Sequence, residues 1–385
     1  MEWKEVRLGD VCNIITGFPF PGKKYSKEGI RVVRGDNVTI GNLRWDTEKD
    51  KRWNEPFDKT EYYSLQANDI VIGMDGSRVG KNKARIKEED LPLLLAQRVA
   101  CVRHNELAEQ DYLYYNIFSK KFIDYVNSIH TGSAIPHISQ KQIEDYKILL
   151  PNLETQRRIA AILSSLDRKI ELNNKINADL EEMAQAIFKN WFVDFEPFKD
   201  GKFLDSELGM IPEGWKVGCL GDIAEITSGK RPPKKSKDKT KELFIPLIGA
   251  SDIMGFTSDV LYERPILVIG RVGTHGVVQR FQEKCWPSDN TLVIESSYYN
   301  YVYQLLKGID YSAINRGSTQ PLITQTDVKN TDVIIAPENV LKEYESITST
   351  LFSKHRANIK ENSRLSTLRD TLLPRLMSGE LEVPE

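Results

Sequence analysis

Residues 151–195 read PNLETQRRIAAILSSLDRKIELNNKINADLEEMAQAIFKNWFVDF, and the architecture of the chain follows from them. Their apolar and asparagine side chains recur at alternating steps of four and three residues: Ile159, Leu163, Leu166, Ile170, Asn173, Asn177, Leu180, Ala184 and Ile187. That spacing keeps one stripe of a helix facing a partner helix, as in a coiled coil. We therefore expect a long helix from about Asn152 to Phe192, introduced by Pro151.

The same pattern returns near the C-terminus at an offset of 185 residues, which is the difference between 358 and 173. Its members are Tyr344, Thr348, Leu351, His355, Asn358, Asn362, Leu365, Arg369 and Leu372. This second helix is expected over residues 339–373, with Pro374 stopping or kinking it. Asparagines at matched seam positions cost stability but can fix the register of a helix pair. We expect the two helices to pack on each other; the alternative is that each docks separately on its own domain.

Short motifs of the first half of the chain also return in the second half. Trp3, Leu8-Gly9-Asp10 and Gly17 reappear as Trp215, Leu220-Gly221-Asp222 and Gly229. Gly132-Ser133 and Pro136 reappear as Gly317-Ser318 and Pro321. The chain is therefore interpreted as a tandem duplication of a variable domain followed by a helix. The expected division is a first domain over 1–150, a central helix over 151–195, a linker and second domain over 196–336, and a C-terminal helix and tail over 337–385.

Both variable domains have a mixed pattern of short strands and at least one helix. Strands are expected at 31–33, 70–72 and 99–102 in the first domain, and at 244–248, 266–269 and 291–294 in the second. Residues 111–128 have helical spacing. Pro246 lies inside one strand candidate, which restricts that strand to the edge of a sheet. The fold class is therefore α+β, with two mixed domains and two long helices.

Composition excludes several classes of protein. The 385 residues carry a formal charge of −2 and contain no apolar run long enough to span a membrane. The four cysteines, Cys12, Cys101, Cys219 and Cys285, form no Cys-x-x-Cys pair, which favours a reducing, cytoplasmic location over a zinc site or disulfides. With so little net charge, a nucleic-acid binder of this composition must gather its basic groups locally.

Three sequence features that could suggest an enzyme each depart from the motif they resemble. Residues 54–57, Asn-Glu-Pro-Phe, differ from the Asn-Pro-Pro-aromatic signature of DNA methyltransferases, because Glu55 replaces the first proline. Residues 76–82 have the wrong glycine spacing for a phosphate loop. The five histidines share no metal-ligand spacing. We therefore expect no catalytic residue, no metal ligand and no cofactor.

Basic and polar side chains in loops remain as binding candidates. In the first domain these are Arg78, Lys81, Lys83, Arg98 and Ser133. In the second domain they are Lys230, Arg231, Lys234, Lys235, Arg271, His275, Asn290, Arg316 and Ser318. Lys and Arg neutralise phosphates, whereas Arg and Asn can also read base edges, so these residues are predicted to contact DNA. The alternative is that they are solvated surface side chains or, for Ser133 and Ser318, parts of a purely structural turn.

Four stretches of the chain together resemble the specificity subunit of type I restriction–modification systems. They are the opening Trp3 with Leu8-Gly9-Asp10; residues 132–136 (GSAIP) followed by 151–159 (PNLETQRRI); residues 191–197 (WFVDFEP) with 206–215 (SELGMIPEGW); and residues 372–380 (LLPRLMSGE). The second copy departs from the pattern after Pro337, where residues 156–158 (QRR) have no equivalent.

The resemblance implies a non-catalytic subunit with two target-recognition domains on an antiparallel coiled-coil helix pair, each domain reading one half of a split site in double-stranded DNA. A duplicated chain can take a pseudo-two-fold arrangement that suits two half-sites. The implied partners are two methyltransferase subunits and the restriction subunits, in a complex that methylates adenine and cleaves DNA with ATP. Two alternatives stay open: an enzyme with built-in specificity, and a protein scaffold whose repeated domains do not bind DNA.

Overall fold

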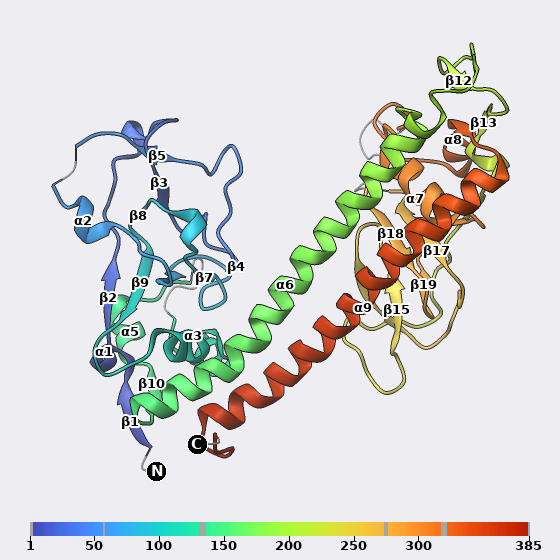
Figure 1. The fold of residues 1–385 in the computed structure, drawn as a ribbon. Coiled ribbons are helices and arrows are strands. Elements are labelled where there is room, and N and C mark those ends of the chain that lie inside the picture. Colours follow the sequence, from blue (N-terminus) through green and yellow to red (C-terminus); the bar gives the residue numbers. More distant parts are fainter. Residues whose placement is uncertain (1–2, 57, 131–135, 273–275, 317–321, 384–385) are drawn as a thin grey trace. The chain divides into compact units, whose positions relative to one another are not determined.

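The computed structural model describes residues 3–56, 58–130, 136–272, 276–316 and 322–383. The chain divides into two compact units, the first made of Met1–Leu172 with Glu361–Glu385 and the second of Asn173–Lys360. Each unit contains a mixed α/β part and a segment of each of two long helices, α6 (Leu153–Phe192) and α9 (Glu338–Met377) (Figure 1).

The first unit is built on two sheets that are linked by short connections. The five-stranded sheet has the order β2 (Cys12–Thr16), β9 (Val99–His104), β6 (Ile70–Gly73), β7 (Lys83–Arg85) and β4 (Ile40–Gly41). The three-stranded sheet has the order β5 (Arg52–Trp53), β3 (Ile30–Val33) and β8 (Leu93–Leu95). A separate pair joins β1 (Lys4–Arg7) to β10 (Lys147–Leu150). Strand β3 runs parallel to β8, whereas β6 is antiparallel to both β7 and β9.

Short helices pack beside the two sheets of the first unit, with α2 next to β8 of the smaller sheet. They are α1 (Leu8–Val11), α2 (Thr60–Tyr63), α3 (Gln110–Phe118), α4 (Lys120–Ile129) and α5 (Gln140–Glu144), with 3-10 turns at Gly22–Lys24 and Glu88–Asp90. The single helix expected over 111–128 is wrong, because Ser119 adopts an extended backbone and divides the segment. Its hydroxyl caps α4 by accepting a hydrogen bond from the Phe122 N–H.

The second unit repeats the order of four of the five strands of the larger sheet and of all three strands of the smaller sheet. Its larger sheet runs β14 (Glu225–Ser228), β20 (Thr291–Glu295), β17 (Ile266–Gly270) and β18 (Val278–Phe281). Its smaller sheet runs β16 (Ile253–Thr257), β15 (Ile245–Ile248) and β19 (Trp286–Pro287), and β13 (Lys216–Cys219) pairs with β21 (Asp332–Ile335). As in the first unit, the middle strand of the smaller sheet has one parallel and one antiparallel neighbour. The tandem duplication is thus confirmed by topology.

The remaining elements of the second unit are short. They are α7 (Tyr299–Gly308), α8 (Gln325–Lys329), 3-10 turns at Glu196–Phe198 and Leu220–Asp222, and the paired strands β11 (Phe203–Leu204) and β12 (Ile211–Pro212). The expectation that Pro246 confines its strand to an edge is wrong, since β15 is the middle strand of its sheet. The parallel neighbour β19 pairs only with Leu247 and Ile248, so the missing N–H of Pro246 breaks no ladder bond on that side.

The two long helices form where the seam spacing predicts them. Helix α6 covers 40 residues from Leu153 to Phe192, which confirms the first prediction. Helix α9 does not stop at Pro374 but continues to Met377. A proline removes one helical hydrogen bond, and here the following turn is held by the Ser378 N–H donating to the Pro374 carbonyl (N···O 3.1 Å) and by Leu376, which is 1 % exposed.

Within each unit, the segments of α6 and α9 pack antiparallel. In the first unit, Arg369 binds Asp167 (N···O 2.6 Å) and Glu361 lies near Lys169 (3.5 Å), so residue numbers fall along α9 as they rise along α6. In the second unit, the Asn358 amide donates to the Asn177 side-chain oxygen at 2.9 Å. The prediction that the helices pack on each other is confirmed, and separate docking is excluded.

The buried asparagine pair of the second unit gives a stability prediction. Asn358 is 1 % exposed, so Asn177→Ala removes the acceptor of a buried amide and should lower the free energy of unfolding by about 1–3 kcal/mol. The double variant Asn177→Leu/Asn358→Leu should recover most of that loss, because no polar group is left unpaired. Urea unfolding measures both. Asn190→Ala, at an exposed position of α6, is the control and should change stability little. A double variant as unstable as the single one would contradict the role assigned to the pair.

Candidate nucleic-acid interface

The strand order of the first unit brings several loops to one edge. Parallel strands β3 and β8 end at the same edge of their sheet. Strand β8 leads through three residues, 96–98, into β9, whose start lies beside the end of the antiparallel strand β6. The connections that follow β3, β6 and β8 therefore converge, although they are far apart in the sequence.

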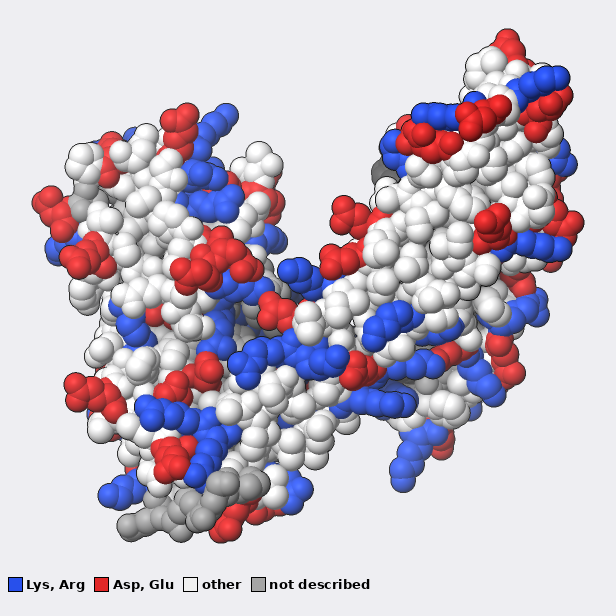
Figure 2. Space-filling view, in the orientation of Figure 1, with Lys and Arg blue, Asp and Glu red and all other residues white. Residues whose placement is uncertain are grey.

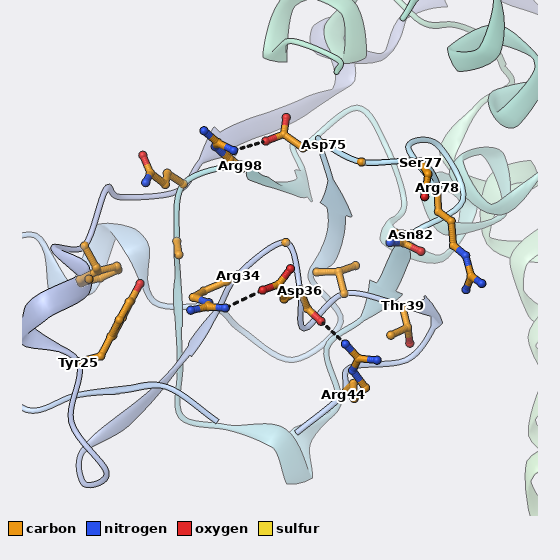
Figure 3. Close-up of a pocket in the computed structure, with 17 residues that line it drawn as sticks. Tyr25, Arg34, Asp36, Thr39, Arg44, Asp75, Ser77, Arg78, Asn82 and Arg98 are labelled. Carbon is orange, nitrogen blue, oxygen red and sulfur yellow. Dashed lines mark hydrogen bonds and ion pairs between the residues drawn. The ribbon is translucent and has the colours of Figure 1, made fainter. Parts of the chain in front are cut away.

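These converging loops line a groove with a volume of about 650 Å³ (Figure 3). Its basic side chains are Arg34, Arg44, Arg78 and Arg98. Its neutral polar side chains include Tyr25, Thr39, Ser77, Asn82 and Gln97. Two acids, Asp36 and Asp75, complete the polar lining. Guanidinium and amide groups on a concave surface are the groups that proteins use to contact phosphates and base edges.

A glycine allows two backbone segments to approach each other closely at this edge. A Cβ atom at Gly17 would lie 2.1 Å from the Ala96 carbonyl oxygen, so no other residue fits without moving the backbone. Gly229 stands in the same relation to the Ser288 carbonyl oxygen of the second unit, again at 2.1 Å. The repeated glycine noted in the sequence is thus a close-approach position in both units.

One side of the groove is organised by a buried asparagine. Asn37 is fully buried, and its amide nitrogen donates to the carbonyls of Arg44 and Lys49, each at 3.0 Å. Its side-chain oxygen accepts from the Arg34 N–H at 3.0 Å. These bonds fix the loop that carries Arg34 and Arg44. The Arg34 guanidinium then binds Asp36 at 2.8 Å and lies 5.8 Å from the centre of the Tyr25 ring.

The opposite side of the groove is organised around Asp75. The Arg98 guanidinium binds one oxygen of this carboxylate at 3.2 Å, and His137 Nδ1 contacts the other oxygen. The Asp75 backbone is itself bridged to His137, and the Gly76 N–H donates to the Pro136 carbonyl at 3.0 Å. Asp75 is therefore a fixed acceptor, whereas the Arg98 side chain is 70 % exposed.

Arg98 also has an unusual backbone. Its φ is 68°, in the left-handed region that a non-glycine residue adopts at a cost of about 1 kcal/mol. Such strain persists only where the surrounding structure enforces it, and it is concentrated at functional sites.

The second unit presents a corresponding edge. The Lys230 N–H donates to the Pro287 carbonyl (3.0 Å), and the Arg271 N–H donates to the Asn290 carbonyl (2.9 Å). The predicted DNA-contacting residues Lys230, Arg271 and Asn290 therefore lie together. Arg231, Lys234 and Lys235 follow in the exposed loop between β14 and β15. Figure 2 shows both basic and acidic side chains on the drawn face of each unit.

Not every predicted residue belongs to these edges. Lys83 is 3 % exposed, its Nζ donates to the Gly80 carbonyl at 2.9 Å, and burial lowers its pKa to about 7, so it supports the loop from within. Lys81 is exposed on the same loop but does not line the groove. Arg316 does lie beside the second edge, because its N–H donates to the Leu322 carbonyl (3.0 Å) and Leu322 is bridged to Val272, but its guanidinium forms an ion pair with Asp327. Ser133, His275 and Ser318 lie outside the described residues.

Sequence reasoning missed Arg34, Arg44 and Tyr25. The polar stretch Arg34-Gly35-Asp36-Asn37 follows directly after a correctly predicted strand, and this was the available signal for Arg34. Nothing in the local sequence marks Arg44, because its position depends on the fully buried Asn37. Across the described ranges, no cluster of His, Cys, Asp or Glu could hold a metal ion, and no helix is long and apolar enough to cross a membrane.

Comparison with known proteins identifies the class to which this fold and site belong. Residues 1–182 and 212–364 both match the type I restriction modification DNA specificity domain, so the chain belongs to that family, whose domain it contains twice. The match covers both recurring halves of the chain.

Individual relatives agree with this assignment. The chain is 33 % identical over 306 residues to the type I restriction enzyme MjaIX specificity subunit of Methanocaldococcus jannaschii, covering 71 % of this chain and 70 % of that protein. It is 24 % identical to the HindI specificity subunit of Haemophilus influenzae, over 99 % of this chain and the whole of that protein. The crystal structure of an S subunit from M. genitalium has the same fold, with a TM-score of 0.63 at 16 % identity over 98 % of this chain and 96 % of that chain.

The left-handed backbone of Arg98 gives a second stability prediction. Arg98→Gly should be more stable than Arg98→Ala by roughly 1 kcal/mol, because glycine alone adopts this φ without strain. The neighbouring Gln97 has no positive φ, so Gln97→Gly should be less stable than Gln97→Ala by about 0.5–1 kcal/mol. Thermal unfolding of the four variants shows whether glycine or alanine is the more stable residue at each position. If alanine is the more stable residue at both positions, the backbone of Arg98 is not strained.

Proposed function

We propose that this chain is the sequence-specificity subunit of a type I restriction–modification complex, and that each of its recognition domains reads one half of a split site in double-stranded DNA. The observation that carries the proposal is the repeated strand order, which places basic and amide side chains at the same sheet edge in both units. Residues 1–150 and 196–336 are the two recognition domains, and residues 151–195 and 337–385 form the helical part.

DNA binding uses two kinds of contact, one to the phosphate backbone and one to the bases. The dense loop of Lys230, Arg231, Lys234 and Lys235 suits the phosphate backbone, since its charges are exposed and close in sequence. The groove of the first domain and the Arg271–Asn290 edge of the second suit base readout, because backbone hydrogen bonds fix the residues that carry these side chains and, in the first domain, Asp75 orients the Arg98 guanidinium. The chain itself carries out no chemistry. Two methyltransferase subunits and the restriction subunits supply adenine methylation and ATP-dependent DNA cleavage.

Methylome sequencing tests the proposal directly. A host that expresses this chain with its methyltransferase subunit should carry methylated adenine in a split motif with a fixed gap. That motif should vanish when this chain alone is deleted, because the partner then has no sequence specificity. If the methyltransferase is shown to be active and methylates no split motif in the presence of this chain, the proteins are instead better explained as a scaffold and its partner.

The basic loop gives a prediction about salt dependence. Replacing Lys230, Arg231, Lys234 and Lys235 together by alanine should weaken binding to all duplexes alike. The slope of log affinity against log salt should become shallower by about 0.9 for each DNA phosphate that the variant no longer neutralises. The measurement is a salt titration of DNA binding by the assembled methyltransferase complex.

The matched control for that titration is the double variant Lys216→Ala/Lys329→Ala. Both lysines are exposed in the second unit, on β13 and at the end of α8, near the start of β14 rather than its end. This variant should keep the wild-type slope. A quadruple variant with an unchanged slope would remove the loop from the DNA interface.

A further inference from the structure

Arg98 and Asn290 occupy the same position in the two recognition domains. In the first, the Gly17 N–H donates to the Val99 carbonyl (3.1 Å) and the Met74 N–H donates to the Arg98 carbonyl (2.9 Å). In the second, the Gly229 N–H donates to the Thr291 carbonyl (3.0 Å) and the Arg271 N–H donates to the Asn290 carbonyl (2.9 Å). Because Gly17 and Gly229 are the repeated glycines, their bonds to Val99 and Thr291 identify these two residues as equivalent. Each of the two residues thus directly precedes the strand, β9 or β20, beside the repeated glycine.

Both side chains point away from the core at this shared position. The Arg98 side chain is 70 % exposed and lines the groove of the first domain (Figure 3). Asn290 is exposed in the second domain. Their backbones are fixed by strand and loop hydrogen bonds, so each side chain is presented from a rigid point, which base recognition requires.

The surroundings of the two positions differ in a way that fits the two side chains. Asp75, which orients the Arg98 guanidinium, follows Met74, and its backbone is bridged to His137. The equivalent residues after Arg271 are Val272 and Leu322, which are bridged in the same manner. The first domain therefore supplies a carboxylate where an arginine must be held, and the second supplies apolar residues where the side chain is a neutral amide.

We propose, on the basis of the proposed function, that Arg98 reads a guanine in the first half-site and Asn290 reads an adenine at the corresponding place in the second. A guanidinium can donate two hydrogen bonds to O6 and N7 of guanine in the major groove. An asparagine amide donates to N7 of adenine and accepts from its N6 amino group. One duplicated position, filled by two different side chains, thereby gives the two half-sites different sequences.

A phosphate contact does not explain these residues equally well. Asn290 has no charge to neutralise a phosphate. Arg98 has a strained backbone, and its guanidinium is oriented by a paired carboxylate, whereas a phosphate contact needs only charge within reach and tolerates a relaxed residue. The paired acid also reduces the net charge that Arg98 offers to the DNA backbone.

The test is a pair of reciprocal substitutions, Arg98→Asn and Asn290→Arg, in the complete methyltransferase complex. Asparagine tolerates the left-handed backbone at position 98, so the first variant is expected to fold. Methylome sequencing should show that Arg98→Asn changes or relaxes one guanine position of the first half-site and leaves the gap and the second half-site unchanged. Asn290→Arg should change one adenine position of the second half-site only.

Competition binding to duplexes substituted at single positions provides the second measurement, which remains informative where a variant no longer methylates. The wild-type complex should lose roughly ten- to hundred-fold in affinity when that guanine is replaced. The Arg98→Asn complex should show no such preference for guanine at that position. Lys81→Asn, which removes an exposed charge beside the groove, is the control and should weaken binding without altering the motif.

The outcomes separate this inference from the proposed function. A wild-type complex without any split motif would overturn the function itself. A wild-type split motif that both variants leave unchanged at every position, or a uniform loss of affinity for all substituted duplexes, would overturn the base assignments and leave the function standing.

Discussion

Each compact unit is closed by the seam between α6 and α9, two helices that are far apart in the chain. In the first unit, Ile159 and Leu163 of α6 share a cluster with Leu376 of α9 and with Tyr112 and Tyr115 of α3. Neither helix could bury its apolar stripe alone, since a stripe of this spacing needs a partner. The seam therefore contacts both recognition domains: through Tyr112 and Tyr115 in the first unit, and in the second through a core cluster that also contains Ala184 and Tyr344 of the two helices.

Polar contacts give this seam its register. The Asn177–Asn358 bond in the second unit and the Asp167–Arg369 pair in the first can form only when the two helices are aligned in one way. Tyr115 adds a link from the first recognition domain, because its hydroxyl donates to Asp167 at 2.7 Å. A register error would leave the buried Asn177 and Asn358 side chains without each other as partners, at a cost that exceeds their contribution to stability when paired.

The same topology, used twice, separates support from recognition. Gly17 and Gly229 bring equivalent backbones into close contact, and this geometry is common to both domains. The side chains at the resulting edge differ, with Arg98 and Asp75 in one domain and Asn290 and Val272 in the other. A shared backbone with exchangeable side chains allows each domain to take a different DNA sequence without altering its fold.

Sequence patterns alone were enough to predict the duplication, both long helices and six of the strands, because these depend on periodicities and repeated motifs that are local in the chain. The same patterns picked out Arg98, Arg271 and Asn290 as candidates. Three-dimensional packing was needed to show that Lys83 is buried, that Arg34 and Arg44 line the groove, and that Asp75 holds Arg98. Those facts depend on which strands are neighbours, and strand pairing between distant segments is set by the packing of the whole domain and not by any local pattern.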